Sequence, residues 1–185
     1  MTQLDKNQQG KASRNAMMWI LLFFGYEWLV SGLNKLIHSE DFIGEFQNEV
    51  SEAIRGGTPF SFYGDFLNSI VIPNAEGFAV FILAGELFTG GVFILIGILG
   101  LAKVSLTGWV AGLGEAASIV SAFLSINIFL YVGGAYFIGQ ADPFDEGITL
   151  DLLMFLVQLA MIGYFASRIR AGKKQKYTSQ RSITG

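Results

Sequence analysis

Four long apolar segments constrain this chain more than any other feature of its sequence. Each is long enough for the roughly 20 helical residues that cross about 30 Å of hydrocarbon. None alternates like a membrane β-strand, and only helices and closed barrels satisfy their backbone hydrogen bonds in lipid. We therefore predict an all-α fold, a four-helix transmembrane bundle, with spans at about residues 16–37, 78–102, 116–138 and 148–169. Residues 16–169 would form the membrane domain, between a tail at 1–15 and a basic tail at 170–185.

Composition excludes several classes of protein. Hydrophobic residues make up 52% of the 185-residue chain and charged residues only 15%, against about 25% charged in a soluble domain. A basic nucleic-acid binder is therefore excluded. The chain has no cysteine and a single histidine, His38, which removes disulfides, thiolate nucleophiles, iron–sulfur ligands and a bis-histidine haem. We expect no metal site.

The charges are distributed unevenly between the two ends of the predicted spans. Basic residues lie in both tails and in the turn between spans two and three: Lys6, Lys11, Arg14, Lys103, Arg168, Arg170, Lys173, Lys174, Lys176 and Arg181. The two other connections carry acids: Glu40, Asp41, Glu45, Glu49, Glu52, Asp65, Glu76, Asp142, Asp145, Glu146 and Asp151. The positive-inside rule then places both termini in the cytoplasm and the acidic connections outside.

The first outer connection, residues 38–77, contains two patterns. Residues 40–55 have apolar side chains at helical spacing with acids between them, which predicts a short amphipathic helix that lies on the membrane or caps the bundle. The sequence Gly-Gly-Thr-Pro at 56–59 should end it. An aromatic stretch follows at 60–67. Such a stretch is typical of an interfacial belt, and a lid over an outward-facing pocket is the functional alternative.

Each span carries one hydrogen-bonding side chain near its middle. Counting inward at about 1.5 Å per residue places Glu27 roughly 15 Å below the outer boundary and Glu86 at a similar depth. Asn127 and Gln158 fall close to the same level. We therefore expect one connected polar layer in the interior of the bundle.

The two acids of this layer are the strongest candidates for a function. A carboxylate at the bilayer centre costs about 2.5–3.5 kcal/mol on insertion scales, so Glu27 and Glu86 should face inward. Two nearby acids resist ionising together, and we expect one to be protonated or the pair to share a proton. Such a pair can handle protons. The alternative is that the buried polar groups only hold helices together.

Lys35 and Asn34 follow Glu27 along the first span, nearer its outer end. Lys35 could extend to the surface or supply a fixed positive charge to an anion. We treat Asn34, Lys35, Asn127 and Gln158 as candidate substrate-binding residues and Glu27 and Glu86 as candidate proton-handling residues.

The order of several short motifs resembles that of the DoxX/DoxD membrane-protein family. The end of span one, Ser-Gly-Leu-Asn-Lys-Leu at 31–36, resembles the family's G-x-x-K-L motif. Residues 58–67 with Ile72-Pro73 resemble its outer segment, and Ala-Gly-Glu-Leu at 84–87 with Gly90 and residues 95–97 resembles its second helix. Asn127 lies where the third helix of the family tends to carry Asn. Lys35 and Glu86 match family positions, whereas Glu27 matches none.

This resemblance implies a multi-pass protein of the inner (cytoplasmic) membrane of bacteria or archaea. DoxD-like members form part of thiosulfate:quinone oxidoreductase, so the resemblance implies a membrane subunit of a quinone-linked oxidoreductase complex. The alternative is a non-catalytic accessory subunit of a larger respiratory or photosynthetic complex. In either case we expect no cofactor held by the chain itself, quinone or lipid as candidate ligands, and the lipid bilayer and other subunits as partners. A small transporter is disfavoured because no inverted repeat is evident.

Overall fold

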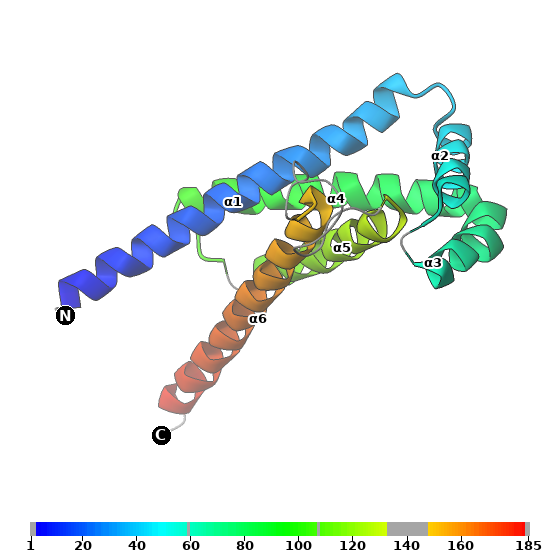
Figure 1. Cartoon of the computed structure of the whole chain (residues 1–185). Coiled ribbons are helices and arrows are strands. Elements are labelled where there is room, and N and C mark those ends of the chain that lie inside the picture. Colours follow the sequence, from blue (N-terminus) through cyan, green and yellow to red (C-terminus); the bar gives the residue numbers. More distant parts are fainter. Residues whose placement is uncertain (1–2, 59, 107, 133–147, 184–185) are drawn as a thin grey trace.

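The computed structural model describes residues 3–58, 60–106, 108–132 and 148–183, and every regular element in these ranges is helical. The elements in chain order are α1 (Gln3–His38), α2 (Phe42–Gly56), α3 (Ser61–Phe66), a π-helical turn (Leu67–Val71), a 3₁₀ turn (Ile72–Asn74), α4 (Ala75–Leu101), α5 (Trp109–Val132) and α6 (Leu150–Ile183). Figure 1 shows both chain ends at one end of the molecule and α2 and α3 at the other.

Four helices are long and apolar enough to cross a bilayer, which confirms the predicted number of spans. The apolar stretches cover Ala12–His38, Ser61–Leu101, Trp109–Val132 and Leu150–Lys173. The helices extend beyond the predicted spans, because α1 begins at Gln3 and α6 continues to Ile183. Residues 133–138 of the third predicted span lie outside the described residues, as do Asp142, Asp145 and Glu146.

The long helices pack in the order α1, α4, α5, α6, with α1 against α4, α4 against α5 and α5 against α6. All four contribute to one hydrophobic core, in which Met18, Leu21, Phe93, Met161 and Phe165 are fully buried. Large apolar side chains point outward from α4, α5 and α6, among them Val80, Ile119 and Leu156. In a membrane such side chains would contact lipid.

Glycines allow α1 and α4 to pack closely. A Cβ atom added to Gly90 would lie 2.5 Å from the backbone nitrogen of Leu29, and one added to Gly97 would lie 2.7 Å from the side chain of Leu22. On α1, a Cβ atom on Gly25 would lie 2.8 Å from the nitrogen of Ile94. Small residues at such crossings let membrane helices approach through van der Waals contact. Gly90 and Gly97 of α4 therefore serve close packing against α1.

A second, smaller core lies at the end of the molecule that carries α2. It joins Val50 of α2 to Tyr63, Leu67 and Val71 of the segment that follows. Helix α2 begins at the cap Asp41, whose carboxylate accepts a hydrogen bond from the nitrogen of Gly44 at 3.0 Å. It ends before Gly57, whose φ of 86° is a left-handed conformation that favours glycine. The predicted end of this helix at Gly-Gly-Thr-Pro is therefore confirmed.

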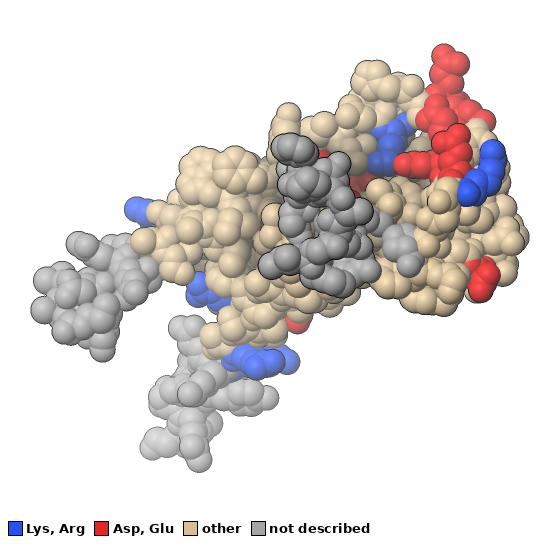
Figure 2. Space-filling view, in the orientation of Figure 1, with Lys and Arg blue, Asp and Glu red and all other residues tan. Residues whose placement is uncertain are grey.

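Charged side chains also separate along the molecule. Acidic side chains gather over α2 and the adjoining end of α1 in Figure 2, where Glu40, Asp41, Glu45, Glu49 and Glu52 are exposed. Figure 2 shows several Lys and Arg side chains toward the end where both termini lie. The acids and many of the basic side chains therefore lie at opposite ends of the long helices.

Candidate functional site

An ion pair between α1 and α4 holds the most deeply buried charge that the structure describes. Glu86 is only 2% exposed, and the ammonium group of Lys35 donates to both of its carboxylate oxygens, at 2.8 and 2.9 Å. Lys35 also donates to Ser31 Oγ at 2.8 Å, and Ser31 Oγ donates to Glu86 Oε1 at 3.3 Å. The three side chains form a closed set of hydrogen bonds, which is what a charge buried in an apolar environment requires.

The local sequence explains why these three groups meet. Ser31 and Lys35 are four residues apart, so they lie on one face of α1. Gly32 lies between them, and a Cβ atom there would be 3.3 Å from the Cβ atom of Glu86. The missing side chain lets α4 come close enough for Glu86 to reach both groups. Lys35 remains 33% exposed, so the pair is open to solvent or ligand on one side.

Glu27 does not belong to this site. The prediction that Glu27 and Glu86 face each other in the bundle interior is wrong, because Glu27 is exposed on α1. Glu86 lies beside Gly32, five residues or about 7.5 Å along the helix axis from Glu27. The expected pair of acids sharing a proton is replaced by an acid paired with a lysine.

Asn34 is also absent from this cluster. It is exposed on α1, whereas its neighbour Lys35 turns toward Glu86. Asn34, a candidate substrate-binding residue, therefore does not join Lys35 at this site.

Asn127 and Gln158 belong to two further polar groups rather than to one connected layer. Tyr63 donates its hydroxyl hydrogen to Asn127 Oδ1 at 2.8 Å, and Ser125 donates to Gln158 Oε1 at 3.1 Å. Within the described ranges, no hydrogen bond joins these two pairs to each other or to Glu86. Gln158 is fully buried, and its amide nitrogen has no partner in the part of the chain that the structure describes.

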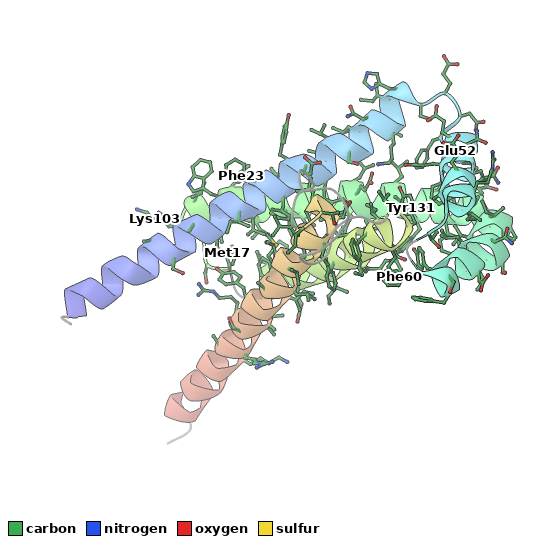
Figure 3. The ribbon with its side chains drawn as sticks, in the orientation of Figure 1. Met17, Phe23, Glu52, Phe60, Lys103 and Tyr131 are labelled. Carbon is green, nitrogen blue, oxygen red and sulfur yellow. The ribbon has the colours of Figure 1, made fainter. Side chains whose placement is uncertain are left out.

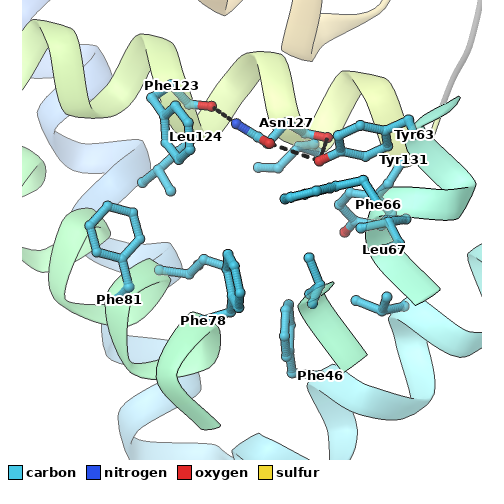
Figure 4. A pocket seen from close by; sticks show the side chains of 14 residues that line it. Phe46, Tyr63, Phe66, Leu67, Phe78, Phe81, Phe123, Leu124, Asn127 and Tyr131 are labelled. Atoms are coloured by element: carbon cyan, nitrogen blue, oxygen red, sulfur yellow. Dashed lines mark hydrogen bonds between the residues drawn. The ribbon is translucent and has the colours of Figure 1, made fainter. Parts of the chain in front are cut away.

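An aromatic-lined cavity of about 80 Å³ lies between the ends of α4 and α5 nearest α2 and the segment from α2 to the π-helical turn. Asn127, Tyr63 and Tyr131 are the lining residues that carry polar side-chain groups. Figure 4 shows the hydrogen bonds from Tyr63 to Asn127 and from Asn127 to the carbonyl group of Phe123. The lining residues are Phe46, Val50, Tyr63, Phe66, Leu67, Val71, Phe78, Phe81, Ile82, Phe123, Leu124, Asn127, Ile128 and Tyr131. We call this space the aromatic pocket.

Two walls of the aromatic pocket differ in character. Helix α2 covers one side with Phe46 and Val50, and its Glu49 accepts a hydrogen bond from Tyr131 at 3.2 Å. On another side, Phe81 and Phe123 are each 50% exposed and meet edge to face with ring centroids 6.1 Å apart. This side of the pocket is therefore more exposed than the side that α2 covers.

The aromatic pocket lies close to the ion pair. Ile82 lines it, and Glu86 follows Ile82 by one helical turn on α4. Leu124, another lining residue, would be 3.1 Å from a Cβ atom on Gly85. Glu86 therefore lies on α4 one turn from a residue that lines the pocket.

Sequence reasoning recognised part of this arrangement. Asn127 was expected to be a binding residue and does line the pocket, and three aromatic-stretch residues, Tyr63, Phe66 and Leu67, line it as well. This placement fits the lid alternative for these three residues, whereas Phe62 is 63% exposed. Tyr131 and Ser125 were missed, because neither is unusual in an apolar helix. No group of three or more His, Asp or Glu residues able to hold a metal ion occurs among the described residues.

Comparisons with known proteins add no identification. No family model, no curated protein and no solved structure matches this chain.

Proposed function

We propose that this chain is a DoxX-like membrane subunit of a quinone-linked oxidoreductase complex, and that the aromatic pocket receives the quinone head. The observation that carries the proposal is the position of an apolar, aromatic pocket with one amide group directly beside a buried Lys–Glu pair. Apolar pockets with a few convergent polar groups are the usual form of small-molecule sites.

The hydrogen bonds of Asn127 favour a ligand that accepts hydrogen bonds. Its carbonyl oxygen already accepts from Tyr63, and one of its amide hydrogens goes to the carbonyl oxygen of Phe123 at 2.6 Å. The second amide hydrogen has no partner among the described residues and can be donated to a ligand. A quinone carbonyl oxygen is such an acceptor, and the flat quinone ring suits contact with Phe66, Phe78 and Phe81.

The ion pair would supply the proton transfer that quinone reduction requires in addition to binding. Reduction of a quinone to a quinol consumes two electrons and two protons. The electrons would come from a partner subunit that oxidises the substrate. Lys35 and Glu86 would exchange protons with the pocket and with the exposed side of the pair. Glu86 lies one helical turn from Ile82 of the pocket, which gives this transfer a short path.

The proposal includes a location and an orientation. The protein would span the inner (cytoplasmic) membrane several times with both termini in the cytoplasm. The charge separation supports this orientation, since basic residues favour the cytoplasmic side. Helix α2 would then be an amphipathic helix on the outer face, with its acids in solvent and Val50 buried beneath it.

A second candidate is an accessory subunit without a catalytic role. Glu27 and Asn34 favour it, because both are polar and exposed on an otherwise apolar helix, and such groups are stabilised in a membrane by protein partners. Both candidates therefore predict a larger assembly.

Binding of a short-chain quinone to the purified full-length chain in lipid vesicles tests the proposal. We expect saturable labelling by an azido-quinone, with the label in the aromatic pocket. Asn127→Leu should weaken binding about tenfold, the loss of one good hydrogen bond in an apolar site. The matched variant Asn15→Leu changes an exposed amide far along α1 and should leave binding unchanged. Labelling that does not saturate, or that Asn127→Leu leaves unaltered, contradicts the proposal.

The intact complex separates the two candidates. If the chain is quinone-linked, Glu86→Gln should abolish turnover of an assembled complex. If it is an accessory subunit, the same variant assembles and turns over normally, whereas deletion of the chain weakens assembly. Purification in mild detergent with mass spectrometry of the co-purifying proteins identifies the partners.

A further inference from the structure

An exposed stripe of seven residues runs along α1 on the side turned away from α4. Its members are spaced alternately four and three residues apart, the heptad pattern of a helix–helix contact. We call this set the α1 seam: Ala16, Ile20, Phe23, Glu27, Val30, Asn34 and Ile37. All are exposed except Val30, which is half-buried. Phe23 is 68% exposed, and Figure 3 shows it on α1.

Glu27 cannot be explained as a lipid-facing residue. Gly25 lies against Ile94 and Leu29 against Gly90, so Glu27 is level with the middle of α4. A carboxyl group at this depth costs about 2.5–3.5 kcal/mol when it faces lipid. Glu27 has no hydrogen-bond or ion-pair partner among the described residues. Its partner must therefore come from outside the part of the chain that the structure describes.

Asn34 lies in the same seam, one heptad further along α1. In heptad terms Ile20, Glu27 and Asn34 occupy equivalent a positions, and the four other members occupy d positions. A polar residue at an a position specifies the register and number of associating helices. Two polar groups spaced by one heptad on an exposed apolar stripe indicate a helix contact with a fixed register.

We propose that the α1 seam binds the α1 seam of a second copy of the chain, in a parallel dimer with two-fold symmetry. The chemistry of the seam favours a copy of itself. An amide group both donates and accepts, so Asn34 can pair with Asn34 of the other copy. A protonated carboxyl group can donate to a carboxylate, so two Glu27 side chains can share one proton.

The geometry of the seam supports the same occupant. Its 21 intervening helical steps correspond to about 32 Å, the full thickness of the hydrocarbon core. A 4–3 spacing gives the left-handed crossing of about +20° that most membrane helix pairs adopt. This contact involves neither the aromatic pocket nor Lys35 and Glu86, so it is independent of the proposed quinone site.

Disulfide cross-linking in lipid vesicles tests the dimer directly, because the chain contains no cysteine. Phe23→Cys places a single thiol on the seam, and we expect oxidation to convert most of the protein to a covalent dimer. Leu95→Cys is the matched control, since Leu95 is exposed on α4 and lies near the same level. The control should cross-link no more than random collision allows.

Substitution of Glu27 then tests the chemistry of the contact. Glu27→Gln keeps a self-complementary group and should retain the dimer, whereas Glu27→Leu should weaken it about 3- to 20-fold, as expected for hydrogen bonds between membrane helices. Helix content and resistance to detergent confirm that each variant is folded. Equal cross-linking at Phe23→Cys and Leu95→Cys overturns the proposal, as does Phe23→Cys cross-linking only to a different protein.

Discussion

Lys35 on α1 and Glu86 on α4 join their helices through an ion pair in which Nζ lies within 2.9 Å of both carboxylate oxygens. The two residues are 51 positions apart in sequence, and α2, α3 and the π-helical turn lie between them. The pair fixes the register of α1 against α4. It also places the carboxylate of Glu86 one helical turn from Ile82 in the aromatic pocket.

Replacement of one partner of this pair should lower the free energy of unfolding more than replacement of both. Lys35→Leu leaves the carboxyl group of Glu86 buried with only Ser31 as a partner. We expect the free energy of unfolding to fall by about 2–3 kcal/mol, less than the 3–5 kcal/mol of a fully buried pair because Lys35 is 33% exposed. The double variant Lys35→Leu/Glu86→Leu should recover most of the loss.

Unfolding in mixed detergent micelles measures this difference. The control is Lys103→Leu, which removes an exposed lysine from the turn after α4 and should change stability little. A double variant as unstable as Lys35→Leu alone would show that the pair stabilises the helix contact rather than merely satisfying a buried charge.

The two adjacent glycines Gly90 and Gly91 give a matched test of the contact between α1 and α4. A Cβ atom on Gly90 would lie 2.5 Å from the backbone of Leu29, whereas one on Gly91 meets nothing within 4 Å. We expect Gly90→Ala to force α1 away from α4 and to destabilise the protein by about 1–3 kcal/mol, as overpacking does.

Gly91→Ala should be neutral or slightly stabilising, because alanine is the better helix former. The measurement is again the free energy of unfolding in micelles, with both variants compared at the same detergent composition. Equal stability of the two variants would mean that α1 and α4 do not approach closely at Gly90.

Hydropathy predicted the four spans because burial in lipid requires about 20 apolar residues whichever way a helix faces. It could not predict how each helix is rotated about its axis. A span that is apolar on all sides has no distinct hydrophobic face that would indicate its rotation. The prediction that Glu27 faces inward therefore depended only on the free-energy cost of a carboxylate in lipid. The rotation of α1 is set by glycines of one helix that lie against larger residues of the other, such as Gly25 of α1 against Ile94 and Gly90 of α4 against Leu29. Those matches are pairwise and cannot be read from one helix.

The same limit explains why the aromatic pocket was only partly foreseen. Asn127 and the aromatic stretch after α2 were notable as separate features of the sequence. Their meeting depends on the turn at Leu67–Val71, which returns Tyr63 to α5. A hydrogen bond between residues 64 positions apart has no local sequence pattern.

The hydrogen bond between Tyr131 and Glu49 should hold α2 over the aromatic pocket. Glu49→Ala removes the acceptor, and we expect the backbone amides of α2 to exchange with deuterium about 2- to 13-fold faster, since one net hydrogen bond is worth about 0.5–1.5 kcal/mol. Glu52→Ala is the control, because Glu52 is exposed on the same helix. If both variants exchange alike, the Tyr131–Glu49 contact does not hold α2 in place.

The hydrogen bond from Ser125 to Gln158 should be the main polar contact between α5 and α6. Both residues are buried, and the amide nitrogen of Gln158 has no partner among the described residues. Ser125→Ala would leave Gln158 without its one described hydrogen bond and should destabilise the protein by about 0.6–1.7 kcal/mol, the range found for hydrogen bonds between membrane helices.

Ser118 provides the control for this measurement, because it is equally buried on α5 but donates to Gly114 within its own helix at 2.7 Å. Ser118→Ala should destabilise the protein less than Ser125→Ala does. The double variant Ser125→Ala/Gln158→Leu should be more stable than Ser125→Ala, because it replaces the unpaired amide with an apolar side chain. A double variant that loses the sum of the two single effects would mean that Ser125 and Gln158 do not interact.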